Sequence, residues 1–327
     1  MTTTRGSLAG IDELAASFRA MGSQVNLRVI DPTPRAAAGI RAAERVFRRI
    51  EATCTRFDPA SALMVANAEP DRWHVLPREC YDAIAAAAEA HRMTHGLFDP
   101  RCLRTLESWG YDHSLPFASG PVELDTPAAL PPRAPVPAES WRPGFDPVAG
   151  AVRLGTDPID LGGIGKGLAV RAAAAELRGS GSAVLVEAGG DCSLAGRGPD
   201  GDGWSVGVED PQGAEHPVAV LRLADVGCAT SSLRLRRWQV DGREVHHLVD
   251  PRTGEPARSG LVAVTVVGAD PARAEVWSKA LLLAGAVEAA ALADQHRLAA
   301  LWVDDQGRLT CSPWMEPLVI WRSDDVD

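Results

Sequence analysis

Lysine is almost absent from this chain. Of its 33 basic residues only two are lysine, Lys166 and Lys279, and the rest are arginine. Arginine is a planar fork of donors, whereas lysine is a compact point charge that can sit against one oxygen or occupy a small pocket. Both lysines lie in segments that stand out for other reasons, so their scarcity marks them as candidate functional residues.

Two further absences bound the class of protein. The six cysteines include no C-x-x-C pair, so reduced thiols in a large core suit them better than a disulfide framework or a zinc site. No stretch approaches the length needed to cross a bilayer, and residues 1–10 lack the basic and apolar regions of a signal peptide. We therefore expect a cytoplasmic protein without membrane insertion.

A basic face is also lacking. The formal net charge is −10, so a nucleic-acid partner is a poor hypothesis. The 327 residues, 46% of them hydrophobic, suffice to bury one large core or two smaller ones. These numbers predict an ordinary globular protein.

Strand and helix patterns follow one another without a strict βαβ alternation. Val25, Leu27 and Val29 alternate as in a strand, and residues 35–54 read as an amphipathic helix. The other expected helices are 79–94, 168–178 and 274–284, and the other expected strands are 183–186, 206–208, 218–223 and 262–267. This order favours an α+β fold, a mixed sheet with packed helices, over a doubly wound sheet.

The sequence also indicates how the chain is divided. Residues 1–20 read as an N-terminal polar extension, followed by a single domain over residues 21–327. From about 114 to 147 the chain is rich in proline and poor in periodicity, which predicts a long surface excursion.

His91 and His95 stand four residues apart at the end of the expected helix 79–94. Because no third ligand type lies nearby, we expect a solvated helix face there and no metal site.

The segment 160–167, Asp-Leu-Gly-Gly-Ile-Gly-Lys-Gly, opens onto an expected helix. Glycines let the backbone approach a ligand closely, and free amides at a helix start attract phosphate oxygens. Lys166 adds a full positive charge in the same turn. The spacing matches neither a Walker loop nor the dinucleotide fingerprint, and a glycine-rich turn packed under the helix is the structural alternative.

Two later segments place polar groups next to expected strands. The turn Glu187-Ala188-Gly189-Gly190-Asp191 presents carboxylates at a strand exit, although Gly-Gly-Asp is also a common turn. Residues 246–256, His-His-Leu-Val-Asp-Pro-Arg-Thr-Gly-Glu-Pro, combine an imidazole, a carboxylate and a guanidinium, which suits proton transfer beside an anion. His247 and Asp250 are the candidate catalytic groups, although this segment can also be a rigid turn between two strands.

The expected helix 274–284 carries Glu275, Ser278 and Lys279 on one face, because positions three and four apart are neighbours. The structural alternative is an exposed Glu–Lys pair that contributes a few tenths of a kcal/mol. The near absence of lysine elsewhere favours a functional role.

Taken in order, these segments resemble the ApbE family, the FAD:protein FMN transferases, from Met21 to about Val303. Residues 21–23 are similar to the family's Met-Gly-Thr, Phe57 stands where an aromatic residue is common, and residues 96–100 resemble Gly-Ala-Phe-Asp-Pro. Residues 160–167 resemble Asp-Leu-Gly-Gly-Ile-Ala-Lys-Gly, residues 187–191 resemble Asn-Ala-Gly-Gly-Asp, and residues 247–256 match His-Ile-Ile-Asp-Pro-x-Thr-Gly-x-Pro closely.

The resemblance implies an α+β fold with FAD in a central cleft. It implies that the FAD pyrophosphate is cleaved with a divalent cation and that FMN passes to a threonine hydroxyl of an acceptor flavoprotein, releasing AMP. It implies that the FAD site is lined by Met21, Phe57, Leu97, Phe98, Asp99, Asp160, Lys166 and Val249. It also implies magnesium held by Glu275, Ser278 and a backbone carbonyl near Gly163, while His247 or Asp250 accepts the threonine proton.

One departure from the family pattern concerns that metal. Members usually carry Asp and Thr at the positions of Glu275 and Lys279, and an ammonium group donates hydrogen bonds without accepting any. A metal cation held by Glu275 and the ammonium group of Lys279 would repel each other at neighbouring positions. We therefore hypothesise that Lys279 pairs with Glu275, takes part in catalysis, and supplies some of the charge that magnesium supplies elsewhere.

Two other functions are compatible with these segments. An FAD pyrophosphatase would use water in place of threonine and release free FMN and AMP. A non-catalytic flavin-binding protein would hold FAD intact, with a metal helix that has lost catalysis. The formation of AMP with and without an acceptor protein separates the three possibilities.

Overall fold

The computed structural model describes residues 1–8, 11–117, 122–124 and 141–323. The chain forms two compact units. Unit 1 comprises Met1–Arg49, Lys166–Ser231 and Gly260–Asp327, and unit 2 comprises Ile50–Gly165 and Ser232–Ser259. Much of the surface excursion expected at 114–147 lies outside the described residues.

Unit 1 is built on a nine-stranded sheet. Its strands in spatial order are β1 (Thr2–Leu8), β2 (Ile11–Ala20), β3 (Ser23–Ile30), β8 (Ala183–Ala188), β9 (Asp191–Ala195), β12 (Val226–Ser232), β17 (Leu261–Gly268), β18 (Ala299–Asp304) and β19 (Leu309–Cys311). The registers from β1 to β12, and again from β17 to β19, are antiparallel. The turn between β8 and β9 therefore lies where these two central strands end, directly before Asp191.

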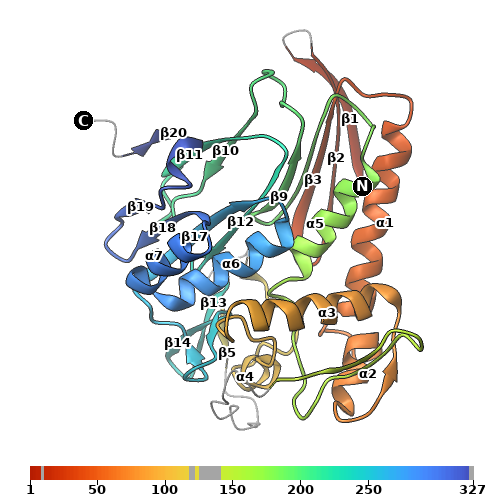
Figure 1. Ribbon diagram of the computed structural model, residues 1–327, viewed down its shortest axis with the longest axis vertical. Helices are drawn as coiled ribbons and strands as arrows, with labels where there is room; N and C mark the ends of the chain where they lie inside the picture. Colours follow the sequence, from red (N-terminus) through yellow and green to blue (C-terminus); the bar gives the residue numbers. More distant parts are fainter. Residues whose placement is uncertain (9–10, 118–121, 125–140, 324–327) are drawn as a thin grey trace. The chain divides into compact units, whose positions relative to one another are not determined.

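Helices pack against this sheet (Figure 1). They are α1 (Ala36–Cys54), α5 (Gly165–Glu176), α6 (Pro271–Ala284) and α7 (Ala286–Gln295). The Phe47 ring of α1 meets the Phe18 ring of β2 edge to face, with centroids 5.6 Å apart. The α6 helix begins at the Asp270 cap, whose side chain accepts a hydrogen bond from the amide of Ala272.

The start of α6 lies in backbone contact with two neighbouring elements. A Cβ atom added to Gly167 of α5 would lie 2.6 Å from the Cα of Ala272, and one added to Gly227 of β12 would lie 2.5 Å from the nitrogen of Pro271. Only glycine permits such an approach. The approach brings the starts of α5 and α6 together, and Lys166 is the second residue of α5 and Glu275 the fifth residue of α6.

A second sheet belongs to unit 1. It consists of β10 (Trp204–Val208), β11 (Ala219–Leu223) and β20 (Val319–Arg322), and the short 3-10 helix η3 (Glu316–Leu318) precedes β20. A buried core joins side chains of this sheet, such as Trp204 and Leu221, to side chains of the large sheet, such as Leu194 and Leu301. The second sheet thus packs against the central strands of the large sheet.

Unit 2 combines short helices with small sheets. Its helices are α2 (Ala62–Ala68), α3 (Arg78–Met93) and α4 (Leu103–Ser108). Its sheets are β14 (Arg243–His246), β13 (Arg237–Val240) and β5 (Glu123–Leu124); β15 (Val249–Asp250) and β16 (Glu255–Pro256); and β4 (His74–Val75), β7 (Ala151–Arg153) and β6 (Gly144–Asp146). Trp109, Tyr111 and Trp238 form the centre of an aromatic core.

The α+β class and the mixed sheet with packed helices are confirmed. Residues 11–20, which we expected to belong to a polar extension, form β2, in which Ala16, Phe18 and Ala20 are buried in alternation. The expected solvated face for His91 is wrong, because His91 is 5% exposed and its Nδ1 lies 3.0 Å from the carbonyl oxygen of Phe98. His95 lies beyond the end of α3.

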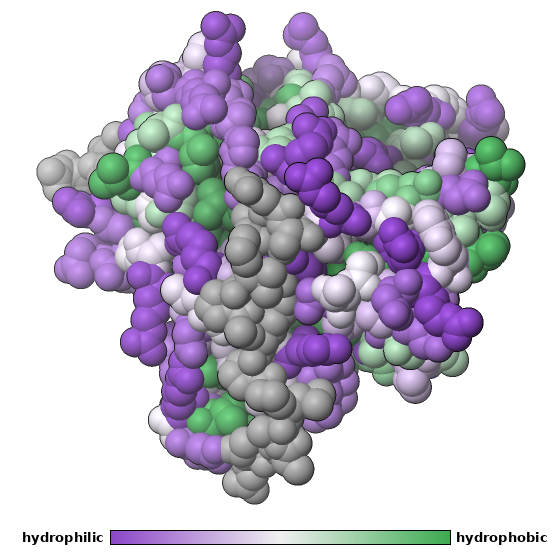
Figure 2. Space-filling model, turned by 60° about the horizontal axis from the view of Figure 1, so that its bottom comes forward, coloured by the Kyte–Doolittle hydropathy of each residue, from purple (hydrophilic) through white to green (hydrophobic). Residues whose placement is uncertain are grey.

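The surface drawn in Figure 2 is mostly hydrophilic, with hydrophobic residues in small separate groups. Among the helices of the described ranges, none is both long enough and apolar enough to cross a membrane. The six cysteines are all free thiols, as expected from their spacing.

Candidate functional site

Lys166 is the second residue of α5 in unit 1, and its side chain is 12% exposed. Its ammonium nitrogen lies 3.0 Å from Oε1 of Glu275 and also donates a hydrogen bond to Oδ2 of Asp191. Glu275 belongs to α6, and Asp191 is the first residue of β9. Two elements, α6 and β9, therefore supply carboxylate partners to this ammonium group of α5.

Glu275 is the centre of the cluster and is 1% exposed. Its Oε1 accepts hydrogen bonds from Lys166 and from Lys279, the latter at 3.2 Å, and its Oε2 accepts from the amide of Gly167 at 2.8 Å. Burial opposes ionisation, but the two ammonium groups outweigh it and lower the pKa of Glu275 to about 2. We call Lys166, Asp191, Glu275 and Lys279 the lysine–carboxylate cluster.

The charges of the other two groups of the cluster, Asp191 and Lys279, are less well balanced by their neighbours. Burial, together with the charge of Glu275, raises the pKa of Asp191 to about 7, and its buried Oδ1 has no hydrogen-bond partner among the described residues. Burial lowers the pKa of Lys279 against the attraction of Glu275. Lys279 is 14% exposed at its side chain and makes one hydrogen bond in the described structure, although an ammonium carries three donors.

Ser278 lies beside the cluster on α6. Its hydroxyl donates to the carbonyl oxygen of Glu275 at 3.0 Å, so the hydroxyl of Ser231, 2.7 Å away, is the donor in the bond between the two serines. The oxygen of Ser278 therefore already accepts one hydrogen bond. Within the described ranges, no three His, Cys, Asp or Glu side chains are grouped so that they could hold a metal ion.

The turn that carries Met21 is close to the same cluster. Met21 connects β2 to β3 with a positive φ of 52°. A Cβ atom added to Gly189 would lie 2.5 Å from Oγ of Ser23 and 4.0 Å from Cδ of Lys166. The Gly189 turn thus lies between Ser23 and Lys166, which places three of the sequence segments in one region of unit 1.

In unit 2, Asp160 lies in the loop before α5. Its amide donates to the carbonyl oxygen of Pro100 at 2.7 Å, and its Oδ1 accepts from the amide of Gly162 at 2.9 Å. Its Oδ2 lies 3.8 Å from Nε of Arg56. Gly163 follows in the same loop, within a turn in which the amide of Gly165 donates to Leu161 at 2.8 Å.

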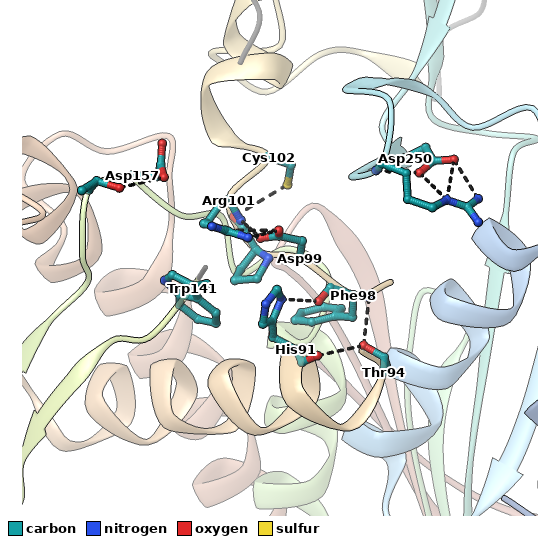
Figure 3. A network of polar contacts seen from close by, with 12 residues as sticks. His91, Thr94, Phe98, Asp99, Arg101, Cys102, Trp141, Asp157 and Asp250 are labelled. Atoms are coloured by element: carbon teal, nitrogen blue, oxygen red, sulfur yellow. Dashed lines mark hydrogen bonds and ion pairs between the residues drawn. The ribbon is translucent and has the colours of Figure 1, made fainter. Parts of the chain in front are cut away.

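Residues 97–99 form the turn after α3 (Figure 3). Leu97 is half-buried, and Phe98 is buried, with its carbonyl oxygen facing His91. The carboxylate of Asp99 is held by Arg101, with Nη2 2.7 Å from Oδ2 and Nε 2.9 Å from Oδ1. Both side chains of this pair are almost fully buried.

The sequence Asp-Pro-Arg recurs at residues 250–252, and the same pairing recurs with it (Figure 3). Nη2 of Arg252 lies 2.8 Å from Oδ2 of Asp250, and its Nε donates to Oδ1 at 3.0 Å. Here the guanidinium side chain is 48% exposed. The segment forms the turn between β15 and β16, in which Val249 pairs with Pro256, so the rigid-turn interpretation is correct for its backbone.

His247 follows β14 and is half-buried. Its Nδ1 lies 3.2 Å from the carbonyl oxygen of Arg236. Because a carbonyl oxygen only accepts hydrogen bonds, Nδ1 carries the hydrogen in the neutral ring and Nε2 carries the lone pair. This tautomer gives the ring a proton acceptor at Nε2.

The structure brings Glu275, Ser278 and Lys279 together, as their helical spacing predicts, and it adds two residues to them. These are Lys166, which we had assigned to the FAD site, and Asp191, which we had singled out only as part of a turn. It also adds a residue that we missed. Arg56 is 7% exposed and contacts both Phe57 and Asp160. The available signal was a lone charge directly before the expected flavin-lining aromatic residue.

Comparison with known proteins gives a consistent result. The model of the ApbE family matches residues 21–302. The "FAD:protein FMN transferase" of Salmonella typhimurium is 30% identical over 161 residues, which are 49% of this chain and 46% of that protein. The chain thus matches about half the length of that relative. The protein of the same name from Klebsiella pneumoniae is 26% identical over 97% of this chain and 85% of its own length.

Solved structures agree with this fold. The crystal structure of the ApbE protein from Thermotoga maritima superposes with a TM-score of 0.77 at 25% identity, covering 93% of this chain and 98% of that one. The Pseudomonas stutzeri flavinyl transferase ApbE gives a TM-score of 0.76 at 23% identity, over 97% of this chain and 98% of that one. The family match over most of the chain, together with the shared fold, establishes that the chain belongs to the ApbE family.

Proposed function

We propose that this chain is an FAD:protein FMN transferase. It binds FAD, breaks the pyrophosphate bond, joins FMN through a phosphoester to a threonine of an acceptor flavoprotein, and releases AMP. The observation that supports this most is the lysine–carboxylate cluster at the start of α5, in a chain of the ApbE family. A buried ammonium beside helix amides is suited to a phosphate group.

The proposed reaction exchanges one phosphorus–oxygen bond for another. The threonine oxygen attacks the phosphorus on the FMN side of the pyrophosphate, the bond from that phosphorus to the bridging oxygen breaks, and AMP leaves with the bridging oxygen. The hydroxyl proton passes to a base on the protein. Such a transfer asks the protein mainly to position groups and to neutralise charge.

We propose that His247 is the base that accepts the proton of the threonine hydroxyl. Its Nε2 carries the lone pair, because the carbonyl oxygen of Arg236 fixes the hydrogen on Nδ1. Both oxygens of Asp250, the other candidate, accept hydrogen bonds from Arg252. We therefore give Asp250 the role of fixing the turn after His247 and presenting the half-exposed Arg252.

We propose that FAD is held by the residues that the family resemblance assigns to it. Phe57, 41% exposed, offers a ring face to a planar group, and Lys166 offers its charge to the diphosphate. The other proposed contacts are Met21, Leu97, Phe98, Asp99, Asp160 and Val249. The Asp99 carboxylate is occupied by Arg101, so we expect the contact of Asp99 to come from its backbone.

The residues at the implied magnesium site do not fit that ion. Mg²⁺ requires oxygen ligands in a nearly ideal octahedron. The two carboxylate oxygens of Glu275 accept two ammonium groups and one amide, and the Ser278 oxygen is hydrogen-bonded. A cation placed there would face Lys279 about one hydrogen-bond length from its ligand, and like charges at that distance repel. We propose that Lys279, held by Glu275, supplies positive charge to the diphosphate.

The first experiment incubates the protein with FAD, with and without an acceptor flavoprotein, and measures AMP. AMP that forms only with the acceptor, together with an acceptor mass increased by FMN, supports transfer. AMP without acceptor would replace transfer by pyrophosphate hydrolysis. FAD that stays bound and intact under both conditions would leave only a flavin carrier.

The second experiment tests the charge that we assign to Lys279. We expect the native protein to transfer FMN equally fast with and without a chelator, and Lys279→Thr to transfer more slowly. Arg273→Thr, which removes an exposed cation from the same helix, is the matched control and should keep the native rate. Full metal dependence of the native protein would refute the assignment to Lys279 and leave transfer itself standing.

We also propose a cytoplasmic location. The six free thiols support it, because cytosolic thiols are kept reduced. Reactivity of the denatured protein with a thiol reagent, immediately after lysis, tests whether all six are reduced in the cell.

A further inference from the structure

A buried arginine in unit 2 has a donor that nothing in the described structure accepts. Arg56 lies two residues beyond the end of α1, and its side chain is 5% exposed. Its Nη1 donates to the carbonyl oxygen of Tyr111, but the buried Nη2 has no partner among the described residues. A buried donor without a partner costs free energy, so stability alone does not account for this side chain.

The guanidinium group lies over two neighbouring aromatic rings, whose centroids are 5.7 Å apart. Its Cζ lies 4.2 Å from the ring centroid of Phe57 and 4.2 Å from that of Tyr111. Tyr111 in turn packs against Trp238, with centroids 5.1 Å apart, and Trp238 donates to the carbonyl oxygen of Trp109 at 2.7 Å. The aromatic core of unit 2 thus fixes Arg56, and Arg56 supports the exposed Phe57 ring.

The same guanidinium is next to a carboxylate that it does not fully engage. Nε of Arg56 lies 3.8 Å from Oδ2 of Asp160, within ion-pair range but beyond a hydrogen bond. The Asp160 carboxylate is already oriented by the amide of Gly162. Arg56 therefore connects an exposed ring to an oriented carboxylate, a combination that suits a planar heteroaromatic group with both faces and edges to recognise.

We propose that Arg56 is a positioning residue for FAD: it holds the Phe57 ring and the Asp160 carboxylate as one rigid unit against which a planar ring of FAD, isoalloxazine or adenine, is bound. This inference rests on the proposed function. Arginine is required because its broad guanidinium group contacts both rings while its charge stays beside Asp160, and the compact ammonium group of lysine cannot contact both. Arg56 is expected to act through Phe57 and Asp160 and not on the reacting atoms.

The experiment compares the native protein with Arg56→Leu and Arg56→Lys. FAD, FMN and AMP affinities are measured by equilibrium titration, and the melting temperature is measured without ligand. Arg153→Leu is the matched control, because Arg153 also lies over an aromatic ring, that of Trp73 at 5.6 Å, but is exposed. We expect Arg56→Leu to bind FAD at least tenfold more weakly than the native protein, with a melting temperature no lower than that of the native protein. Arg153→Leu should bind FAD as the native protein does.

The FMN and AMP arms identify the ring and separate positioning from general damage. A loss confined to FAD and FMN assigns the isoalloxazine, and a loss confined to FAD and AMP assigns the adenine. An equal loss in all three with a lower melting temperature, or FAD affinity within twofold of native, overturns the proposal. If Arg56→Leu fails to fold, Arg56→Lys takes its place in the test. Arg56→Lys should bind FAD more weakly than the native protein, and native affinity would overturn the proposal. A native protein without FAD affinity would instead refute the proposed function.

Discussion

Replacement of Glu275 by glutamine tests the central group of the lysine–carboxylate cluster. Glu275→Gln keeps the size of the side chain but removes the charge that compensates two ammonium groups at 3.0 and 3.2 Å. With all four groups ionised, the cluster changes from neutral to a net charge of +1. The side-chain oxygen of the new glutamine can still accept one hydrogen bond from the amide of Gly167, but the neutral glutamine cannot balance the charges of Lys166 and Lys279.

The size of the effect follows from burial. Glu275 is 1% exposed, and removing one partner of a buried ion pair costs about 3–5 kcal/mol, because an uncompensated charge stays in a medium that solvates it poorly. We therefore expect Glu275→Gln to lose about 3–5 kcal/mol of unfolding free energy. Lys279→Met should lose less than half as much, since Lys166 continues to pair with Glu275.

Urea unfolding at pH 7, followed by the fluorescence of tryptophans that include Trp277 on the same helix, measures this loss. The matched control is Glu44→Gln, which breaks an exposed ion pair with Arg48 on α1 and should change stability by no more than about 0.5 kcal/mol. A loss below about 1 kcal/mol for Glu275→Gln would refute the reasoning, because it would mean that the ammonium groups do not depend on Glu275.

Three further predictions concern other parts of the molecule. His247→Ala should lower the rate of FMN transfer by about 10²–10⁴-fold with unchanged FAD affinity, as expected for loss of a general base, and steady-state kinetics with a binding titration would show both. Burial lowers the pKa of His246 from 6.5, so the stability it contributes is present above pH 6.5 and is lost as the pH falls through the lower folded value; urea midpoints at pH 8 and pH 5 should differ more in the native protein than in His246→Gln. Gly167→Ala should cost about 1–3 kcal/mol by overpacking, because its Cβ would lie 2.6 Å from the backbone of Ala272, whereas Gly6→Ala, with open space around it, should leave the melting temperature unchanged.

The regular elements with strong periodicity were predictable from the sequence. The expected helix 35–54 is α1 (Ala36–Cys54), and the expected strand 262–267 is β17 (Leu261–Gly268). The strand β2 was missed, because its alternate positions from 13 to 19 are charged or small and its buried positions are Ala16, Phe18 and Ala20. Alanine carries a weak strand signal, so the antiparallel pairing with β3 determines this element.

The chemistry of the site was predictable to the level of segments but not of pairs. The spacing of Glu275 and Lys279 on one helix face predicted their contact, because that contact is local. The contacts of Lys166 with Asp191 and Glu275 join residues far apart in the chain, so only the fold reveals them. The same holds for Arg56, whose partners Tyr111 and Asp160 come from distant loops.

We propose above all that Lys166, at the start of α5, binds the diphosphate of FAD. An equilibrium titration of the native protein and of Lys166→Met with FAD tests it most directly. We expect saturable binding by the native protein, with an affinity at least tenfold weaker in Lys166→Met. Absence of saturable binding, or equal affinity in the two proteins, would contradict it.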